Sequence, residues 1–208
     1  MRGQILDAAR ALLAETEDES AVSIRAVAER VGVTTPSIYR HFKDKEALMD
    51  AVCSEVFGAL AVALERAAEP AGSPLERLLA QGRAYVQFAL ANPEQYRMVF
   101  LGNDEPKNVD EVLTERCFTQ VLQAVGECMS AGIFPPDPDG PLPISMQLWA
   151  SAHGLASLML CKPWLPWGDV GTTIERALAQ AVAGCAVAGS PARLAPGAFE
   201  ARLRELNS

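Results

Sequence analysis

Apolar residues recur at helical spacing along the chain, and no segment shows the strict alternation that is typical of a strand. After Ser23, for example, Ile24, Val27 and Val31 fall on one face of a short helix. The same spacing continues through most of the sequence and indicates an all-α protein. It predicts about ten helices, over residues 2–15, 24–31, 35–42, 45–68, 73–91, 94–101, 109–131, 144–160, 169–188 and 196–206.

Two of the short helices are separated by a tight turn. Ser23 can cap the first of them, and Gly32 tolerates the positive φ that a left-handed helix stop requires. Thr34 or Thr35 can cap the second helix, with Pro36 in its first turn, where a missing N–H costs nothing. The second helix is apolar inside, at residues 38 and 42, and polar outside. This is the pattern of a helix-turn-helix.

A long helix follows directly, over residues 45–68. Asp44 can cap it, and its inward positions are apolar along the whole length. It begins beside the helix-turn-helix and ends in the rest of the chain, so it links the two parts mechanically. The inward residues are Leu48, Val52, Val56, Leu60 and Leu64.

The run GVTTPSIYRHFKDKEAL, residues 32–48, resembles the DNA-binding head of TetR-type transcriptional regulators. The resemblance begins near Ile5 and is specific to about Val52. It implies a helix-turn-helix DNA-binding domain over residues 1–47 and a ligand-binding and dimerisation domain over 48–208. Trp149 and the pair His153-Gly154 resemble the C-terminal domain of one TetR subgroup. The matching head positions are Gly32, Val33, Ile38, Tyr39, His41, Phe42, Lys45 and Leu48.

Polar residues of the second short helix are the predicted DNA contacts. A guanidinium can bond guanine bidentately and a hydroxyl can serve any base, which makes Arg40, Ser37 and Thr35 the candidate base readers. The family resemblance implies phosphate contacts from Tyr39, His41 and Lys45. Arg25 has two interpretations that are nearly equal, a DNA contact or an ion pair with Glu29 four residues on. The full predicted set is Arg25, Thr34, Thr35, Pro36, Ser37, Tyr39, Arg40, His41 and Lys45.

Charge is distributed unevenly over the 208 residues. Residues 1–45 hold seven basic and seven acidic side chains, whereas residues 46–208 hold eleven against nineteen, so the net charge of −8 lies in the later part. This acidity weakens non-specific DNA binding without arguing against a DNA-binding head. Half of the residues are hydrophobic, which excludes a disordered chain.

The five cysteines are far apart and form no metal-spaced cluster, which predicts buried free thiols in a reducing cytoplasm. The N-terminus does not have the pattern of a signal peptide, and no run of 18 uninterrupted apolar residues predicts a membrane span. No nucleophile elbow, phosphate loop or carboxylate pair is recognisable, so we expect neither an enzyme nor a bound metal or cofactor.

Aromatic and flexible side chains on the later helices have two interpretations. By spacing alone they are core residues, whereas the family resemblance implies a cavity lined by some of them. His153 is likewise either a hydrogen-bonded core residue or a polar ligand contact. The candidate effector-binding residues are Tyr85, Phe88, Phe118, Leu122, Met146, Trp149 and His153.

The segment 144–160 is apolar on almost every side, which predicts a helix buried on most sides. Together with 169–188 it is expected to form a four-helix bundle with the same helices of a second copy. With the family resemblance, which implies the repressor role, this leads us to expect a homodimeric repressor that leaves a near-palindromic, double-stranded operator when it binds a small, mostly apolar effector. The alternative is a DNA-binding dimer with no small-molecule effector.

Overall fold

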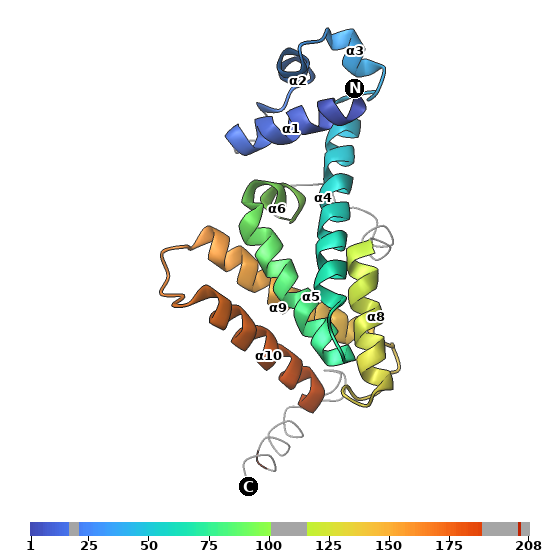
Figure 1. Cartoon of the computed structure of the whole chain (residues 1–208), viewed down its shortest axis with the longest axis vertical. Coiled ribbons are helices and arrows are strands. Elements are labelled where there is room, and N and C mark those ends of the chain that lie inside the picture. Colours follow the sequence, from blue (N-terminus) through green and yellow to red (C-terminus); the bar gives the residue numbers. More distant parts are fainter. Residues whose placement is uncertain (17–20, 101–115, 189–203, 205–208) are drawn as a thin grey trace.

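The computed structural model describes residues 1–16, 21–100, 116–188 and 204, and these residues form helices and no strand. The all-α prediction is confirmed (Figure 1). Residues 109–115 of one predicted helix and all but residue 204 of the predicted helix 196–206 lie outside the described residues. The helices are α1 (Arg2–Thr16), α2 (Ile24–Val31), α3 (Thr35–Tyr39), α4 (Lys45–Ala68), α5 (Pro74–Ala91), α6 (Pro93–Phe100), α8 (Arg116–Ser130), α9 (Leu142–Cys161) and α10 (Val170–Ala188).

The ends of α2 form as the sequence predicts. The hydroxyl of Ser23 accepts a hydrogen bond from the N–H of Ala26, at 3.1 Å. Gly32 adopts a φ of 77°, and the N–H of the next residue, Val33, donates to the carbonyl of Ala28 at 3.0 Å. This backward bond is the Schellman stop, which favours glycine at the left-handed position.

The starts of α3 and α4 differ in how they are capped. Asp44 caps α4 by accepting from the N–H of Ala47 at 2.7 Å, as predicted. Thr34 occupies the cap position of α3, but its hydroxyl lies 3.0 Å from the hydroxyl of Ser37 and makes no bond to the backbone. The side chain of Thr34 is therefore held by a neighbouring side chain at the outer surface of α3.

The described helices pack around separate cores for the head and the body. The first core lies among α1, α2, α3 and the beginning of α4, with Met98 of α6 also buried in it. The other two cores lie among α4, α5, α6, α8, α9 and α10. Figure 1 shows the head projecting beyond the body on the first part of α4. The predicted domain boundary at residue 47 falls in the first turn of α4.

The helix α4 belongs to both parts. Leu48, Val52 and Val56 are buried in the head core, whereas Leu60 and Leu64 are buried in the body core. By length and composition, α4 is the one helix within the described ranges that could cross a bilayer. The apolar inward residues of α4 are buried in the head core and in the body core, which the helix joins.

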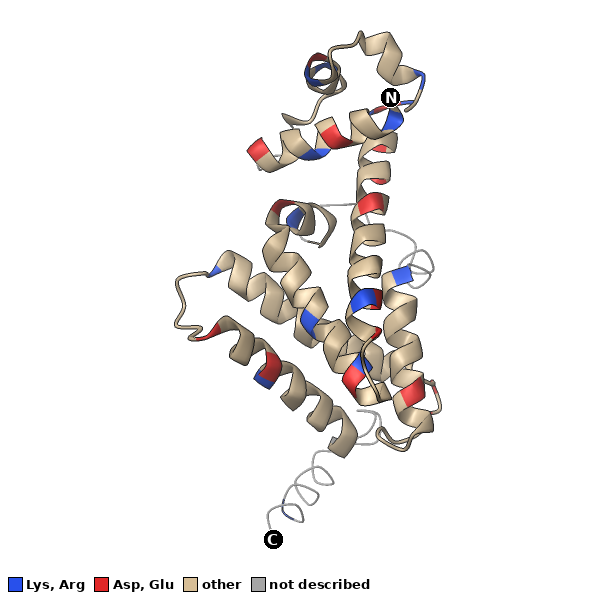
Figure 2. Cartoon of the chain, viewed as in Figure 1, with Lys and Arg blue, Asp and Glu red and all other residues tan. Residues whose placement is uncertain are grey.

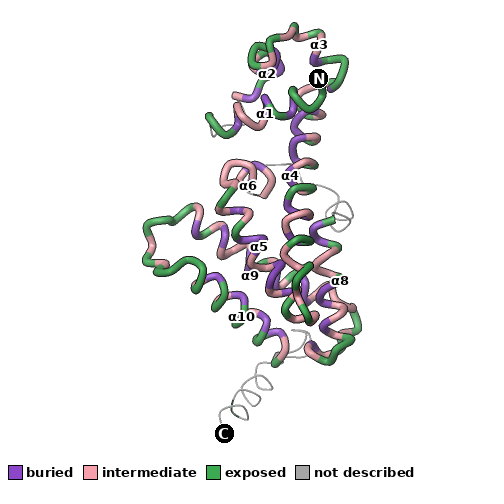
Figure 3. The backbone as a smooth tube through the Cα atoms, in the orientation of Figure 1, coloured by how far each residue is buried: buried purple, intermediate pink, exposed green. Residues whose placement is uncertain are grey.

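The surface of α9 departs from the sequence-based expectation of burial on most sides. In the single chain α9 packs against α5, α8 and α10, but one side is left open, with Met146 and Leu158 at 41% and 51% exposure (Figure 3). The helix also begins earlier than predicted, at Leu142, because Pro143 is accommodated in its first turn.

Four of the five cysteines are buried, as predicted. Cys161 is the exception, and the prediction was wrong there because this residue ends α9 and faces the exposed loop that follows. Burial raises the pKa of the Cys128 thiol to about 11 and also raises that of Cys185. These thiols are therefore protonated at neutral pH and fill space in the body core.

Candidate DNA-binding and ligand-binding sites

The helix α3 presents its polar side away from the molecule. Ile38 is fully buried and Phe42 is 4% exposed, so these two residues anchor the helix to the head core. Arg2 of α1 places its guanidinium 5.1 Å from the centre of the Phe42 ring, a cation–π contact that joins α1 to the end of this segment. Tyr39, next to Ile38 in the sequence, is 52% exposed.

The predicted DNA contacts gather around α3. Thr34, Pro36, Arg40 and His41 are exposed, whereas Thr35, Ser37 and Lys45 are half-buried. Arg40 is the C-cap residue directly after α3, and Lys45 is the first residue of α4. Figure 2 shows basic residues between these two points, at the outer end of the head. The structure thus brings eight of the nine predicted residues to one end of the head.

Arg25 lies on α2 and has a partner of its own. Its Nε donates to Oε1 of Glu29 at 2.9 Å, and both side chains are largely exposed. This hydrogen bond, and to a lesser extent the charge of Glu29, raises the pKa of Arg25. The ion-pair interpretation describes Arg25 in this structure.

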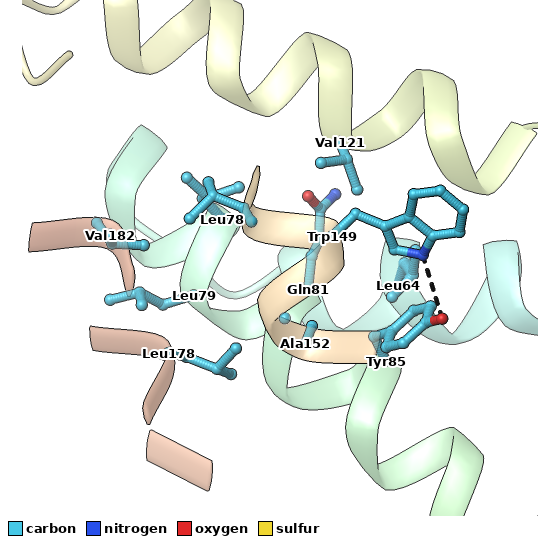
Figure 4. Close-up of a pocket in the computed structure, with 12 residues that line it drawn as sticks. Leu64, Leu78, Leu79, Gln81, Tyr85, Val121, Trp149, Ala152, Leu178 and Val182 are labelled. Carbon is cyan, nitrogen blue, oxygen red and sulfur yellow. Dashed lines mark hydrogen bonds between the residues drawn. The ribbon is translucent and has the colours of Figure 1, made fainter. Parts of the chain in front are cut away.

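A small cavity of about 50 Å³ lies in the body (Figure 4). Its walls are almost entirely hydrocarbon and come from α4, α5, α8, α9 and α10. A cavity of 150 Å³ can hold benzene, so this one has room for only a few water-sized molecules. The lining residues are Leu64, Leu78, Leu79, Gln81, Gly82, Tyr85, Val121, Leu148, Trp149, Ala152, Leu178 and Val182.

A polar network lies behind one wall of the cavity. The Nε1–H of Trp149 donates to the hydroxyl of Tyr85 at 3.2 Å, and that hydroxyl lies 3.2 Å from the hydroxyl of Tyr96. The Nδ1 of His153 lies 2.6 Å from the Tyr96 hydroxyl and 3.2 Å from that of Tyr85. On its other side, His153 Nε2 lies 3.4 Å from the hydroxyl of Ser157. The network therefore ties α5, α6 and α9 together.

The protonation states follow from burial. Desolvation lowers the pKa of His153 and raises the pKa values of Tyr85 and Tyr96. All three groups are therefore neutral at pH 7. In that state Nδ1 can accept a hydrogen bond from Tyr96, while Nε2–H can donate to Ser157.

The predicted effector residues separate into two groups. Tyr85 and Trp149 line the cavity, whereas the others do not. Phe118 packs edge-on against Trp149, with ring centres 5.8 Å apart, and His153 packs against the same indole at 6.0 Å. Met146 is exposed on α9. The remaining two are partly buried, Phe88 against both the head and body cores and Leu122 on α8.

Sequence patterns do not single out Gln81 or Tyr96. Gln81 sits within the apolar stripe of α5 and is 7% exposed, so a polar residue in a buried register is the available signal. Tyr96 lies in a short helix to which the sequence gives no role, and only the fold brings it to His153. Within the described ranges, no group of three or more His, Cys, Asp or Glu side chains is placed to hold a metal ion.

An exposed helix-turn-helix, joined by a shared helix to a helical body with an apolar cavity, defines a class of DNA-binding transcriptional regulators. Comparison with family models agrees with this class. Residues 5–52 match the model for bacterial regulatory proteins of the tetR family, and residues 78–183 match the tetracyclin repressor-like C-terminal domain. The second match covers half of the chain, and the protein belongs to the TetR family of transcriptional regulators. The Trp149 and His153-Gly154 subgroup stays a prediction.

Individual relatives are more distant. The chain is 27% identical over 131 residues to the nucleoid occlusion factor SlmA of Vibrio campbellii. This alignment covers 61% of this chain and 67% of that protein. Over 77 residues, it is 38% identical to the HTH-type transcriptional repressor KstR of Mycolicibacterium smegmatis, 37% of each chain. A solved structure of unknown function from Rhodococcus sp. RHA1 superposes with a TM-score of 0.76 and 28% identity, over 89% of this chain and 95% of that one.

Proposed function

We propose that this TetR-family regulator is a homodimeric repressor that leaves a near-palindromic operator when a small, mostly apolar effector enters the body cavity. One observation carries the proposal: α4 holds Val56 in the head core, and two turns later the same helix gives Leu64 to the cavity wall. A change in the cavity can therefore move the head through one continuous helix.

The operator contacts of this proposal come from α3 and its two ends. Arg40, Ser37 and Thr35 meet base edges, and Tyr39, His41 and Lys45 meet phosphates. The exposure of Tyr39 and the outward position of α3 support these assignments. Arg25 would have to exchange its bond to Glu29 for a phosphate or base, which makes it the weakest member of the set.

The dimer of this proposal forms through α9 and α10. The helix α9 has no charged residue, and α10 has only Glu175 and Arg176 (Figure 2). Exposed apolar side chains lie along the same region, from Met146 and Leu158 of α9 to Val187 of α10. A second copy can cover them by a two-fold contact, which places two α3 helices about one turn of DNA apart, roughly 34 Å.

The effector must enlarge the cavity when it binds. The present volume of about 50 Å³ is well below the ~300–1,000 Å³ of typical small-molecule sites. An effector that binds the enlarged state about 100-fold better than the closed state shifts the equilibrium by at most about 2.7 kcal/mol. Enlargement between α5 and α10 would tilt α4 and change the separation of the two α3 helices.

In vitro selection from a random DNA pool, repeated with a library of small apolar metabolites, tests this function. The expected result is one near-palindromic sequence whose retention falls when one compound class is present. Recovery of no preferred sequence would refute operator recognition. A preferred sequence whose binding is unchanged by every compound that occupies the body would refute the effector response.

A second function is a DNA-binding dimer whose body takes no effector. The small cavity and the likeness to a protein named as a nucleoid occlusion factor favour it. The two functions differ in how the body responds to compounds. Under the second function, no compound would both bind the wild-type protein at one molecule per chain and lower its affinity for the operator. Leu178→Trp, which fills the cavity, would also leave DNA binding unchanged.

A further inference from the structure

The side-chain carbonyl of Gln81 is the one unsatisfied polar atom among the described cavity-lining side chains. Gln81 is 7% exposed, and its Oε1 is fully buried with no hydrogen-bond partner. Figure 4 shows its amide reaching from α5 toward Val121 of α8, close to Trp149. The walls around it offer hydrocarbon, so none of the described lining residues replaces the hydrogen bonds that this carbonyl makes in water.

The other polar groups in the lining already have partners. The Tyr85 hydroxyl has three, on Trp149, Tyr96 and His153, and the Trp149 N–H is used in one of these bonds. An entering molecule therefore finds a free hydrogen-bonding site at Gln81. Among the described lining residues there is also no Lys, Arg, Asp, Glu or His, so a charged molecule would meet no compensating charge from them.

A buried carbonyl oxygen without a hydrogen-bond partner destabilises the fold. Leaving one buried acceptor unsatisfied costs about 1–3 kcal/mol, and a leucine of similar size at this position would avoid that cost. A ligand with a donor group would recover it on binding. Because Gln81 lies on the cavity wall, a ligand in the cavity can donate the hydrogen bond that its carbonyl lacks.

We propose that Gln81 is the specificity-determining anchor of the cavity, and that the cavity takes neutral, mostly apolar molecules with one hydroxyl or N–H donor. Simple alcohols and phenols are the minimal members of this class. The donor meets Oε1 of Gln81 while the hydrocarbon part spreads the walls between α5, α8 and α10. This assignment rests on the proposed effector function and names the chemical class of the effector.

The test compares two ligands of equal shape on matched variants. Phenol and toluene differ only in a hydroxyl against a methyl group, and their dissociation constants are measured by calorimetric titration of the full chain. The variants are Gln81→Leu, with Gln81→Met as a second apolar replacement of the same length. Gln120→Leu is the matched control, because Gln120 on α8 also has a buried, unpartnered Oε1 but does not line the cavity.

The ratio of the toluene to the phenol dissociation constant is expected to fall about tenfold or more in both Gln81 variants and to stay unchanged in Gln120→Leu. An equal ratio in the wild type and the Gln81 variants overturns the assignment, and so does failure of the wild-type chain to bind phenol. Binding of the same preparations to selected operator DNA separates this from the wider function. If operator binding persists but the dissociation-constant ratio is the same in the wild type and the Gln81 variants, only the role of Gln81 is refuted. If phenol binds but does not alter operator affinity, the effector response is refuted.

Discussion

Gly184→Arg tests the proposed dimer without disturbing the single chain. Gly184 is exposed on α10, and a Cβ built at this residue meets no atom within 4 Å. An arginine there therefore has open space in an isolated chain. Replacing a glycine inside a helix also favours the helix by about 0.8–1 kcal/mol. The folded monomer should be at least as stable as before.

In the proposed dimer the same side chain is a severe obstruction. Small residues that allow close approach of two α10 helices form a strip along α10, at Ala177, Ala181, Gly184 and Ala188. Forcing a large group into a packed contact costs about 1–3 kcal/mol, and the two-fold axis repeats it. The expected loss is about 2–6 kcal/mol, or a dissociation constant raised roughly 30-fold to more than 10⁴-fold.

Sedimentation equilibrium over a concentration series measures this dissociation constant. Gly126→Arg is the matched control, because a Cβ added at Gly126 on α8 also meets nothing within 4 Å and lies outside the proposed contact. Gly184→Arg should shift the chain toward monomer while Gly126→Arg stays dimeric. A wild-type chain that is monomeric at micromolar concentration, or equal dissociation constants for both variants, contradicts the α9–α10 interface.

Further predictions concern the DNA contacts and the buried histidine. Arg40→Ala should reduce the binding free energy by about 1–3 kcal/mol per half-site on the operator and far less on scrambled DNA, and it should relax one base preference. Lys45→Ala should instead weaken binding to both duplexes alike. It should also reduce the slope of log affinity against log salt by about one per subunit. Salt titrations on both duplexes measure this, and equal losses for Arg40→Ala would make it a backbone contact. Because burial lowers the pKa of His153 below its ordinary 6.5, the unfolded chain binds a proton more readily. Stability is therefore full above about pH 6.5 and declines as pH falls through the lowered value, by at most about 1.4 kcal/mol per pH unit. Urea unfolding should show this slope in His41→Gln and not in His153→Gln.

The head could be predicted from the sequence because its determinants are local. The cap at Ser23, the helix stop at Gly32 and the buried pair Ile38 and Phe42 each involve residues only a few positions apart in the sequence. Each of these features forms as expected. A local pattern cannot choose between two interactions of similar strength. For this reason the sequence does not decide between DNA and Glu29 as the partner of Arg25, and in the structure the carboxylate lies within 2.9 Å.

The family resemblance implied a cavity, but most of its lining could not be predicted, because the walls come from five helices distant in sequence. Apolar periodicity identifies the inward side of each helix but not whether two inward sides meet without a gap. Tyr85 and Trp149 could be predicted because they are large aromatic side chains on the body helices. Leu178, Val182 and Gly82 give no comparable signal. At Gly82, for example, a Cβ would lie only 3.2 Å from the side chain of Leu178, and this close approach is visible only in the fold.

The position of α6 shows that α4 is not the single connection between head and cavity. Tyr96 and Met98 are two residues apart, about 200° around a helix, so they face opposite sides. Tyr96 is buried in the body core, 2.6 Å from Nδ1 of His153, and Met98 is buried in the head core. His153 packs in turn against Trp149, which lines the cavity. Two side-chain contacts and one short helix therefore connect Trp149 with the head, and in the proposed switch they would pass a displacement of Trp149 to it. Since α6 packs on α1 and α4, such a displacement acts on the head from the side while α4 acts along its axis. In the proposed switch, a rotation of the head would therefore have to change the contacts of α6 as well as the tilt of α4.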